Sequence, residues 1–277
     1  MTALPAPGQP PAVQPHQAYL DASRAPLTGL VFTLPLFVVY HAGLWLNHSG
    51  WRNAADDLIA KGLSWLGVGA PFISFIFVVF CFLVAQQAAG TVWRRPRFDT
   101  LFWMALESVF FALPVFLLSR ATRFVTRDLD LRWLLEAVEN VAPGAGGPAG
   151  MAEAAADVVS AESASWARFL ADVSLCSGAG VYEEFLFRML LLGLLLWGFR
   201  WWMGPGRPGT FLWPVLLQAL LFAAFHHLPG SEEPLVWSVF AFRVVAGVYF
   251  AYLYLERGFG IAAGAHAGYD LIAIALA

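Results

Sequence analysis

Charged residues are scarce in this chain, and their scarcity limits the kinds of protein it can be. Only 13% of the 277 residues are Asp, Glu, Lys or Arg, and 59% are hydrophobic. Ordinary soluble proteins carry about 25% charged residues. The formal net charge of -3 is too small to indicate nucleic acid or another strongly charged partner. Together with a mean hydropathy of +0.65, these values favour an integral membrane protein.

Cysteine and the common soluble-enzyme motifs are also nearly absent. The chain has 2 cysteines, Cys81 and Cys176, in apolar stretches without metal-type spacing, so we expect buried thiols rather than a disulfide. No His-Glu-x-x-His motif occurs, which excludes the zinc site of soluble metalloproteases. Neither a basic start nor an apolar run precedes Leu27, so no secretory signal is expected.

Apolar runs long enough to cross a bilayer dominate the remaining sequence, and each crossing takes about 20 residues. We predict an all-α, polytopic bundle of about seven transmembrane helices, with six to eight compatible with the pattern, as one membrane domain over residues 26–277. Residues 1–25 are Pro-rich and predict a disordered tail. The predicted spans are residues 26–46, 63–89, 100–118, 173–199, 211–228, 235–255 and 260–277.

The segments between the predicted spans are polar or basic. Residues 51–61 predict an amphipathic helix at the membrane surface, residues 120–150 break the hydrophobic pattern, and residues 152–172 predict a helix too acidic to span. Short cytoplasmic loops carry the excess of arginine, so residues 94–97 place the N-terminus in the cytoplasm. The composition is typical of a protein of the bacterial cytoplasmic membrane.

One predicted span contains a cluster of charge, at Gly178–Arg188. An ionised side chain at the centre of a span costs about 2.5–3.5 kcal/mol, and such residues are functional candidates. Glu184 and Arg188 are four residues apart, in the order that favours an ion pair on one helix face. Glu183 has no partner nearby in the sequence. The alternative reading is a buried Glu–Arg pair that only fixes helix packing.

Histidines on later spans complete a candidate site. His226 and His227 end one span, and His266 and Asp270 are four residues apart on the last, so that they share a helix face. A glutamate can take a proton from water that a histidine holds, and a second polar pair can stabilise an oxyanion. Small residues allow close helix contact around the last pair: Ala262, Ala263, Gly264, Ala265, Ala267 and Gly268.

The order of these motifs carries a family resemblance. Glu183-Glu184-x-x-x-Arg188, Phe222-x-x-x-His226 and His266-x-x-x-Asp270 resemble the CPBP (ABI) family of intramembrane proteases, which includes the type II CAAX prenyl endopeptidases. The resemblance covers residues 173–277. It implies an all-helical membrane endopeptidase in which Glu183 and His226 activate water. It also implies an oxyanion site at His266 and Asp270, although the family often has Asn at the last position.

Two other readings of the site stay open. Members of the family have been described as metalloproteases and as glutamate-dependent enzymes, and Glu183, His226, His266 and Asp270 are residue types that could complete a zinc shell. A membrane scaffold or ligand transporter is the third hypothesis, which the lack of an evident repeated half disfavours. The partners expected are membrane lipid and a lipidated or otherwise membrane-associated peptide, while the sequence does not indicate the substrate or the oligomeric state.

Two further residues, His227 and Arg243, are assigned supporting roles. His226 keeps the spacing from Phe222, and we therefore prefer it to its neighbour His227 as the catalytic histidine. Arg243 lies too deep in its span for its charge to reach the surface easily, so it needs an anion. The candidates are Asp270, Glu107 and a substrate carboxylate. We favour Asp270, because the last two spans are joined by a short connection and should pack side by side.

Overall fold

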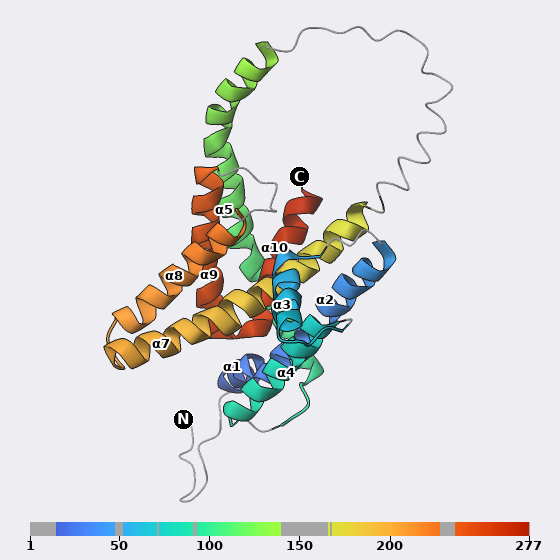
Figure 1. The fold of residues 1–277 in the computed structure, drawn as a ribbon, viewed down its shortest axis with the longest axis vertical. Coiled ribbons are helices and arrows are strands. Elements are labelled where there is room, and N and C mark those ends of the chain that lie inside the picture. The colour runs from blue at the N-terminus through green and yellow to red at the C-terminus, as the bar shows by residue number, and fades with distance from the viewer. Residues whose placement is uncertain are drawn as a thin grey trace, which may run out of the picture.

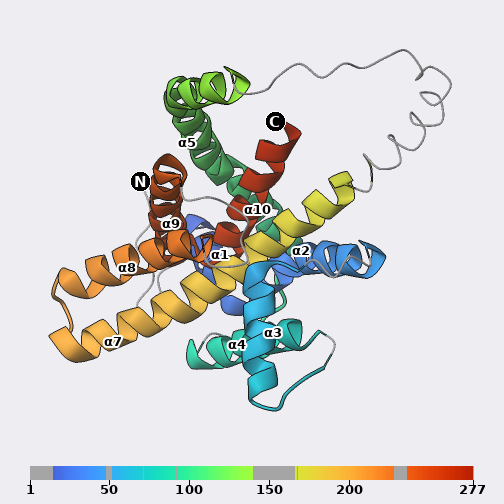
Figure 2. The ribbon, with the colours of Figure 1, turned by 45° about the horizontal axis from the view of Figure 1, so that its top comes forward.

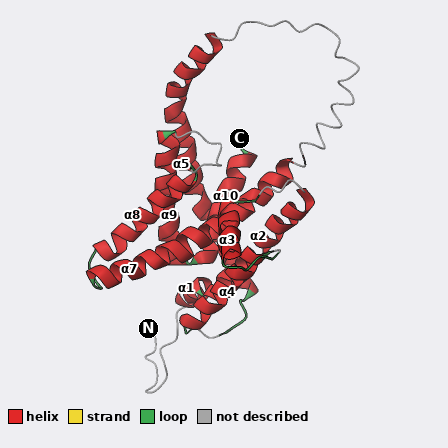
Figure 3. Ribbon diagram, viewed as in Figure 1, coloured by secondary structure: helices red, strands yellow, loops and turns green. Residues whose placement is uncertain are grey.

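The structure is a computed structural model that describes residues 15–47, 52–70, 72–90, 93–139, 166, 168–227 and 236–276, without the side chains of 123–139. Within these ranges all regular structure is helical (Figure 3). The prediction of an all-α membrane bundle is therefore confirmed.

The helices follow one another with short connections. The first part of the chain forms α1 (Pro15–Arg24), α2 (Pro26–Asn47), α3 (Ala54–Trp65), α4 (Ile73–Ala88) and α5 (Phe98–Glu139). A long helix then comprises residues 168–178, the π-helical segments η1 (Ala179–Glu183) and η2 (Phe185–Leu192), and α7 (Gly193–Met203). The chain continues through α8 (Gly209–Phe225), α9 (Trp237–Arg257) and α10 (Phe259–Ala275).

The apolar helices are those of an integral membrane protein. Three are long and apolar enough to cross a membrane, at Pro26–Leu46, Phe98–Thr122 and Trp237–Arg257. Shorter apolar helices lie at Ile73–Ala88, Gly209–Phe225 and Phe259–Ala275. With the charged central helix, they correspond approximately to the predicted spans.

The central helix crosses the middle of the molecule, and α10 packs against its η1 segment (Figures 1 and 2). Small residues make this contact close, as predicted. A Cβ atom added to Gly180 of η1 would lie 2.7 Å from the carbonyl oxygen of Ala263 in α10. On the other side of α10, a Cβ atom added to Gly264 would lie 2.6 Å from Ser108 Oγ in α5. α10 is thus held between the central helix and α5.

Several predicted boundaries are wrong. The disorder expected over residues 1–25 does not hold for Pro15–Arg24, because these residues form α1, which begins at a proline, a favoured first helical residue. The span predicted at 63–89 is interrupted after α3, where Gly67 adopts a φ of 79°. The helix predicted to end at residue 118 continues through the arginine-rich region to Glu139. The polar helix predicted at 152–172 lies mostly outside the described residues.

Candidate active site

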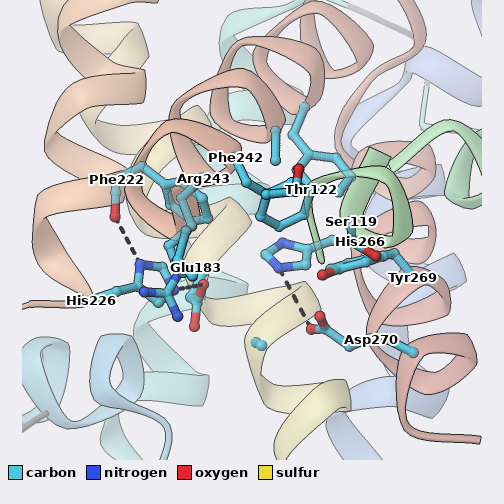
Figure 4. Close-up of a pocket in the computed structure, with 15 residues that line it drawn as sticks. Ser119, Thr122, Glu183, Phe222, His226, Phe242, Arg243, His266, Tyr269 and Asp270 are labelled. Carbon is cyan, nitrogen blue, oxygen red and sulfur yellow. Dashed lines mark hydrogen bonds and ion pairs between the residues drawn. The ribbon is translucent and has the colours of Figure 1, made fainter. Parts of the chain in front are cut away.

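A cavity of about 380 Å³ lies between α5, η1, α8, α9 and α10 (Figure 4). It is lined by the predicted site residues Glu183, His226, Arg243, His266 and Asp270. His226 and His266, which come from different helices, therefore line one cavity. Its remaining walls are mostly apolar and include aromatic rings from α8 and α9. The structure thus brings together, around a single space, residues that are widely separated in the sequence.

Glu183 is buried at the end of η1, with only 6% of its surface exposed. Its Oε1 atom accepts a hydrogen bond of 2.9 Å from Asn53 Nδ2. Its Oε2 atom has no hydrogen-bond partner among the described residues and lies 3.6 Å from His226 Nε2. That separation is too long for a direct hydrogen bond. Asn53 therefore fixes one oxygen of this carboxylate, and the other oxygen is buried on the side of His226, beside the cavity.

His226 follows the last residue of α8, and its ring is oriented by the backbone of its own helix. His226 Nδ1 lies 2.8 Å from the carbonyl oxygen of Phe222. Because a carbonyl only accepts, Nδ1 must carry the proton and donate it. In the neutral ring, Nε2 is then an acceptor directed toward Glu183. The Phe-x-x-x-His spacing seen in the sequence thus sets which nitrogen of His226 faces the cavity.

Glu184, the neighbouring glutamate, has a different role. It is fully buried and does not line the cavity. Its Oε1 atom lies 3.1 Å from Arg188 Nη1 and accepts from His266 Nδ1 at 2.7 Å. The predicted Glu184–Arg188 ion pair is therefore present. The Arg188 guanidinium also lies 4.3 Å from the centre of the Phe222 ring, a cation–π contact that partly offsets its burial.

His266 joins this buried ion pair to the cavity. While Nδ1 contacts Glu184, Nε2 lies 3.6 Å from Asp270 Oδ2, one helical turn along α10. The His266 ring stacks on Phe250 of α9, with 4.7 Å between the ring centres and 15° between the planes. Contacts at both nitrogens and on the ring face fix the orientation of His266. The shared face predicted for His266 and Asp270 is confirmed.

The direct Arg243–Asp270 ion pair is not found among the ion pairs of the described residues. Arg243 Nη1 instead donates to His227 Nε2 at 3.4 Å. The carboxylate of Asp270 is directed toward His266 on its own helix. Glu107, the second candidate, is paired with Arg257. Arg243 and Asp270 nevertheless line the same cavity.

The four residues considered as zinc ligands do not form a ligand set in this arrangement. Among the described residues, no three His, Cys, Asp or Glu side chains are placed to hold one metal ion. His266 accounts for part of this result, because Nδ1 contacts Glu184 and Nε2 faces Asp270. The zinc hypothesis stays a prediction, and we derive no step of the chemistry from it.

The helix that carries both glutamates has an unusual backbone. Ala179–Glu183 and Phe185–Leu192 are π-helical. Such segments are rare and often mark functional sites. Nothing in the amino-acid sequence indicated this distortion. Its consequence is visible in the contacts, since adjacent glutamates reach different partners, one beside the cavity and one within the core.

Asn53 is a contact of the site that the sequence did not reveal. It precedes α3 and lies far from the charged motif in the chain, yet its side chain reaches Glu183. The stretch around it predicted only an amphipathic helix, and an Asn before such a helix indicates a cap. No local sequence pattern could show that the nitrogen of the same side-chain amide donates to Glu183.

Fold and site together define an integral membrane protein with a buried carboxylate and an imidazole facing one cavity. Residues 165–272 match the family model described as Type II CAAX prenyl endopeptidase Rce1-like. The match confirms the resemblance drawn from the three motifs, and this family is one of proteases. The C-terminal part of the chain is therefore similar to an Rce1-like CAAX protease domain. Comparisons with curated proteins and with solved structures found no match.

Proposed function

We propose that the protein is an intramembrane endopeptidase that cleaves a prenylated, CAAX-type or similar membrane-associated peptide, with Glu183 as the general base. The observation that carries this proposal is the pair of acceptors at the cavity wall. Glu183 Oε2 is buried, has no hydrogen-bond partner in the part of the chain that the structure describes, and lies 3.6 Å from His226 Nε2. A carboxylate held in this way is suited to take a proton from a molecule that enters the cavity.

In this proposal, one water molecule lies beside the two acceptors and bridges them. A water about 2.8 Å from each atom can span this separation and donate one hydrogen to each acceptor. Its lone pairs are then directed away from both groups and toward the cavity. Asn53 and the Phe222 carbonyl hold the two acceptors in place, so the water would be oriented before the substrate arrives.

The chemistry follows from this orientation. As the water oxygen forms a bond to the peptide carbonyl carbon, Glu183 removes its proton. The protonated Glu183 then delivers that proton to the amide nitrogen as the carbon–nitrogen bond breaks. The products are a carboxylic acid and an amine, and Glu183 is restored as the carboxylate. His226 holds the water and stabilises the charge that develops on it.

His266 is the proposed donor to the oxyanion formed on the carbonyl oxygen. Its Nδ1–H donates to Glu184, so the protonated ring offers Nε2–H toward Asp270 and the cavity. Asp270 orients this imidazolium, an assignment that accounts for an acid where the family often has Asn. Donors fixed before the reaction stabilise developing charge without reorganising, which is often the largest contribution to catalysis.

Two observations support a lipidated peptide as substrate. The matched family is described by its action on prenylated CAAX sequences. The cavity combines the polar groups with apolar walls from Phe222, Phe242 and Phe250, which suit a chain in contact with lipid. Arg243 at the same cavity offers a positive charge to a peptide carboxylate.

The neighbouring histidines provide the test. Detergent-purified wild-type protein is incubated with a farnesylated CAAX peptide, and the products are identified by mass spectrometry. We expect cleavage by the wild type, loss of cleavage in His226→Ala, and retained cleavage in His227→Ala. The reverse pattern would assign the role to His227. Binding of the peptide by the wild type without cleavage would favour the scaffold or transporter hypothesis.

A chelation series on the same protein addresses zinc. If Glu183 and His226 act on water alone, 1,10-phenanthroline leaves cleavage unchanged. Loss of cleavage with chelator, and its recovery on adding Zn²⁺, would support the metal-dependent reading instead. A non-chelating phenanthroline isomer is the control for inhibition that does not involve a metal.

A further inference from the structure

The carboxylate of Glu183 is held from behind by a part of the chain that lies outside the Rce1-like region. Asn53 Nδ2 donates to Glu183 Oε1 at 2.9 Å, and both side chains are almost fully buried. Asn53 does not line the cavity and cannot touch a molecule bound there. Any effect of Asn53 on the reaction must therefore pass through Glu183.

Both ends of the Asn53 amide have partners that fix which way it faces. Its Oδ1 atom accepts from the backbone N–H of Ala55, capping the first turn of α3. A backbone N–H only donates and a carboxylate oxygen only accepts, so the amide has one arrangement that satisfies both. The start of α3 and the carboxylate of Glu183 are thereby locked to each other.

The start of α3 is in turn anchored by a buried acid. Asp56 is fully buried and accepts from Tyr40 at 2.8 Å, from Arg52 at 3.0 Å and from Ser74. The Tyr40 hydroxyl also accepts the backbone N–H of Asn53 at 2.9 Å. These bonds tie α3 to α2 and to the start of α4. A loop residue is in this way given the rigidity that a precise contact requires.

We infer that Asn53 is a positioning residue for the proposed hydrolysis: it holds Glu183 Oε1 so that Oε2 faces His226 and the cavity. This role rests on the proposed function. It also gives the N-terminal helices a part in the chemistry, because the matched region does not contain this donor. A misplacement of about 1 Å at a reacting group can reduce the rate about 10²-fold, so one hydrogen bond can matter at this position.

Two substitutions separate positioning from helix capping. Asp and Ser are good cap residues, so Asn53→Asp and Asn53→Ser should both preserve the first turn of α3. Asn53→Ser removes the donor to Glu183. Asn53→Asp replaces that donor with a second carboxylate, and two adjacent carboxylates retain a proton that occupies the base. The matched control is Asp57→Asn on the same helix, where Asp57 pairs with Lys61 on an exposed face.

The experiment measures kcat, KM and the thermal unfolding midpoint of each variant with the farnesylated peptide. We expect kcat to fall about tenfold in Asn53→Ser and about 100-fold in Asn53→Asp, with KM and unfolding close to wild type. Asp57→Asn should match the wild type in kcat.

Three results would overturn the inference in different ways. Wild-type kcat in both Asn53 variants would leave the proposed function standing and remove the positioning role. A fall in kcat that follows a lower unfolding midpoint and a higher KM would make Asn53 purely structural. If the wild-type protein cleaves no peptide, the proposed function fails and the positioning role fails with it.

Discussion

Two glutamates on apolar helices, Glu107 and Glu183, show how differently this molecule treats the same side chain. Glu107 lies in the part of α5 that is long and apolar enough to cross a membrane, and Glu183 lies at the centre of the molecule. Both border cavities, of about 800 Å³ for Glu107 and about 380 Å³ for Glu183. Proximity to a cavity therefore does not distinguish them.

The pairing of the carboxylate oxygens does distinguish them. Arg257 donates to both oxygens of Glu107, at 2.6 and 2.7 Å, and Tyr19 donates to one of them at 2.6 Å. Burial and, after it, the hydrogen bond to Glu107 raise the pKa of Tyr19, so this hydroxyl remains a donor at neutral pH. Glu183, in contrast, has one oxygen for which the described residues provide no hydrogen-bond partner.

The comparison also needs Glu184, because among the described residues its Oε2 atom lacks a hydrogen-bond partner as well, yet Glu184 does not line the cavity. Only Glu183 combines an unpaired carboxylate oxygen with a place at the cavity, and this combination distinguishes it from the two structural acids. A bidentate arginine and a tyrosine leave Glu107 no role beyond holding α1, α5 and α9 together. An unsatisfied buried oxygen is costly and calls for an explanation. At Glu183 the explanation we propose is the water that the cavity admits between Glu183 and His226.

The largest expected effect is on catalysis, from Glu183→Gln. The amide keeps the shape of the side chain and an acceptor for Asn53, and it removes only the base. We expect kcat to fall about 10²–10⁴-fold, the usual contribution of a general base, with an unchanged unfolding midpoint. Steady-state kinetics and thermal unfolding in detergent measure both. Cleavage by folded Glu183→Gln protein at the wild-type rate would show that Glu183 is not the base. The difference between Glu183 and Glu107 would then have no bearing on catalysis.

A smaller effect, on stability, is expected from Glu184→Gln. This change leaves the fully buried Arg188 without its counter-ion. Removing one partner of a buried ion pair lowers the free energy of unfolding by about 3–5 kcal/mol. The folded yield and the unfolding midpoint should both drop. Adding Arg188→Met removes the stranded charge and should recover much of the loss, which is the matched control. Equal stability of Glu184→Gln and wild type would show that the ion pair contributes little.

The smallest effect is expected from Glu107→Gln. Arg257 loses its counter-ion, but the Glu107 side chain is 23% exposed. The loss in the free energy of unfolding should therefore be smaller than for a fully buried pair, where it is about 3–5 kcal/mol. The kcat of the folded protein should be unchanged, because no residue of this cluster reaches the cavity of Glu183. A large loss of kcat at wild-type stability would instead assign Glu107 a part in the reaction.

The sequence was informative wherever the interacting residues lie a helical turn apart. The Glu184–Arg188 pair, the His266–Asp270 face and the Phe222–His226 spacing could all be predicted, because helix geometry alone brings such residues together. The long apolar runs likewise predicted the bundle. Contacts between distant helices could not be predicted in this way. The Arg243–Asp270 pair was predicted because the last two spans should pack side by side, and the packing of two helices does not say which way a side chain points.

Asn53 illustrates the other limit. Its role as a cap is a local property and is readable from the residues that follow it. Its contact with Glu183 depends on the crossing of α3 over the π-helical segment, which no short stretch of sequence encodes. The same holds for Glu107, whose partners Tyr19 and Arg257 come from opposite ends of the chain.

The central claim is that Glu183 acts as a base on water, and a single turnover in H₂¹⁸O tests it most directly. Excess wild-type protein cleaves the farnesylated peptide once, and mass spectrometry then locates the label in the product and in the peptide that contains Glu183. If water attacks the carbonyl directly, the new carboxyl group of the product carries one ¹⁸O atom and Glu183 carries none. Unlabelled product with ¹⁸O in the Glu183 carboxyl group would show that Glu183 attacks the substrate itself, and it would contradict the account.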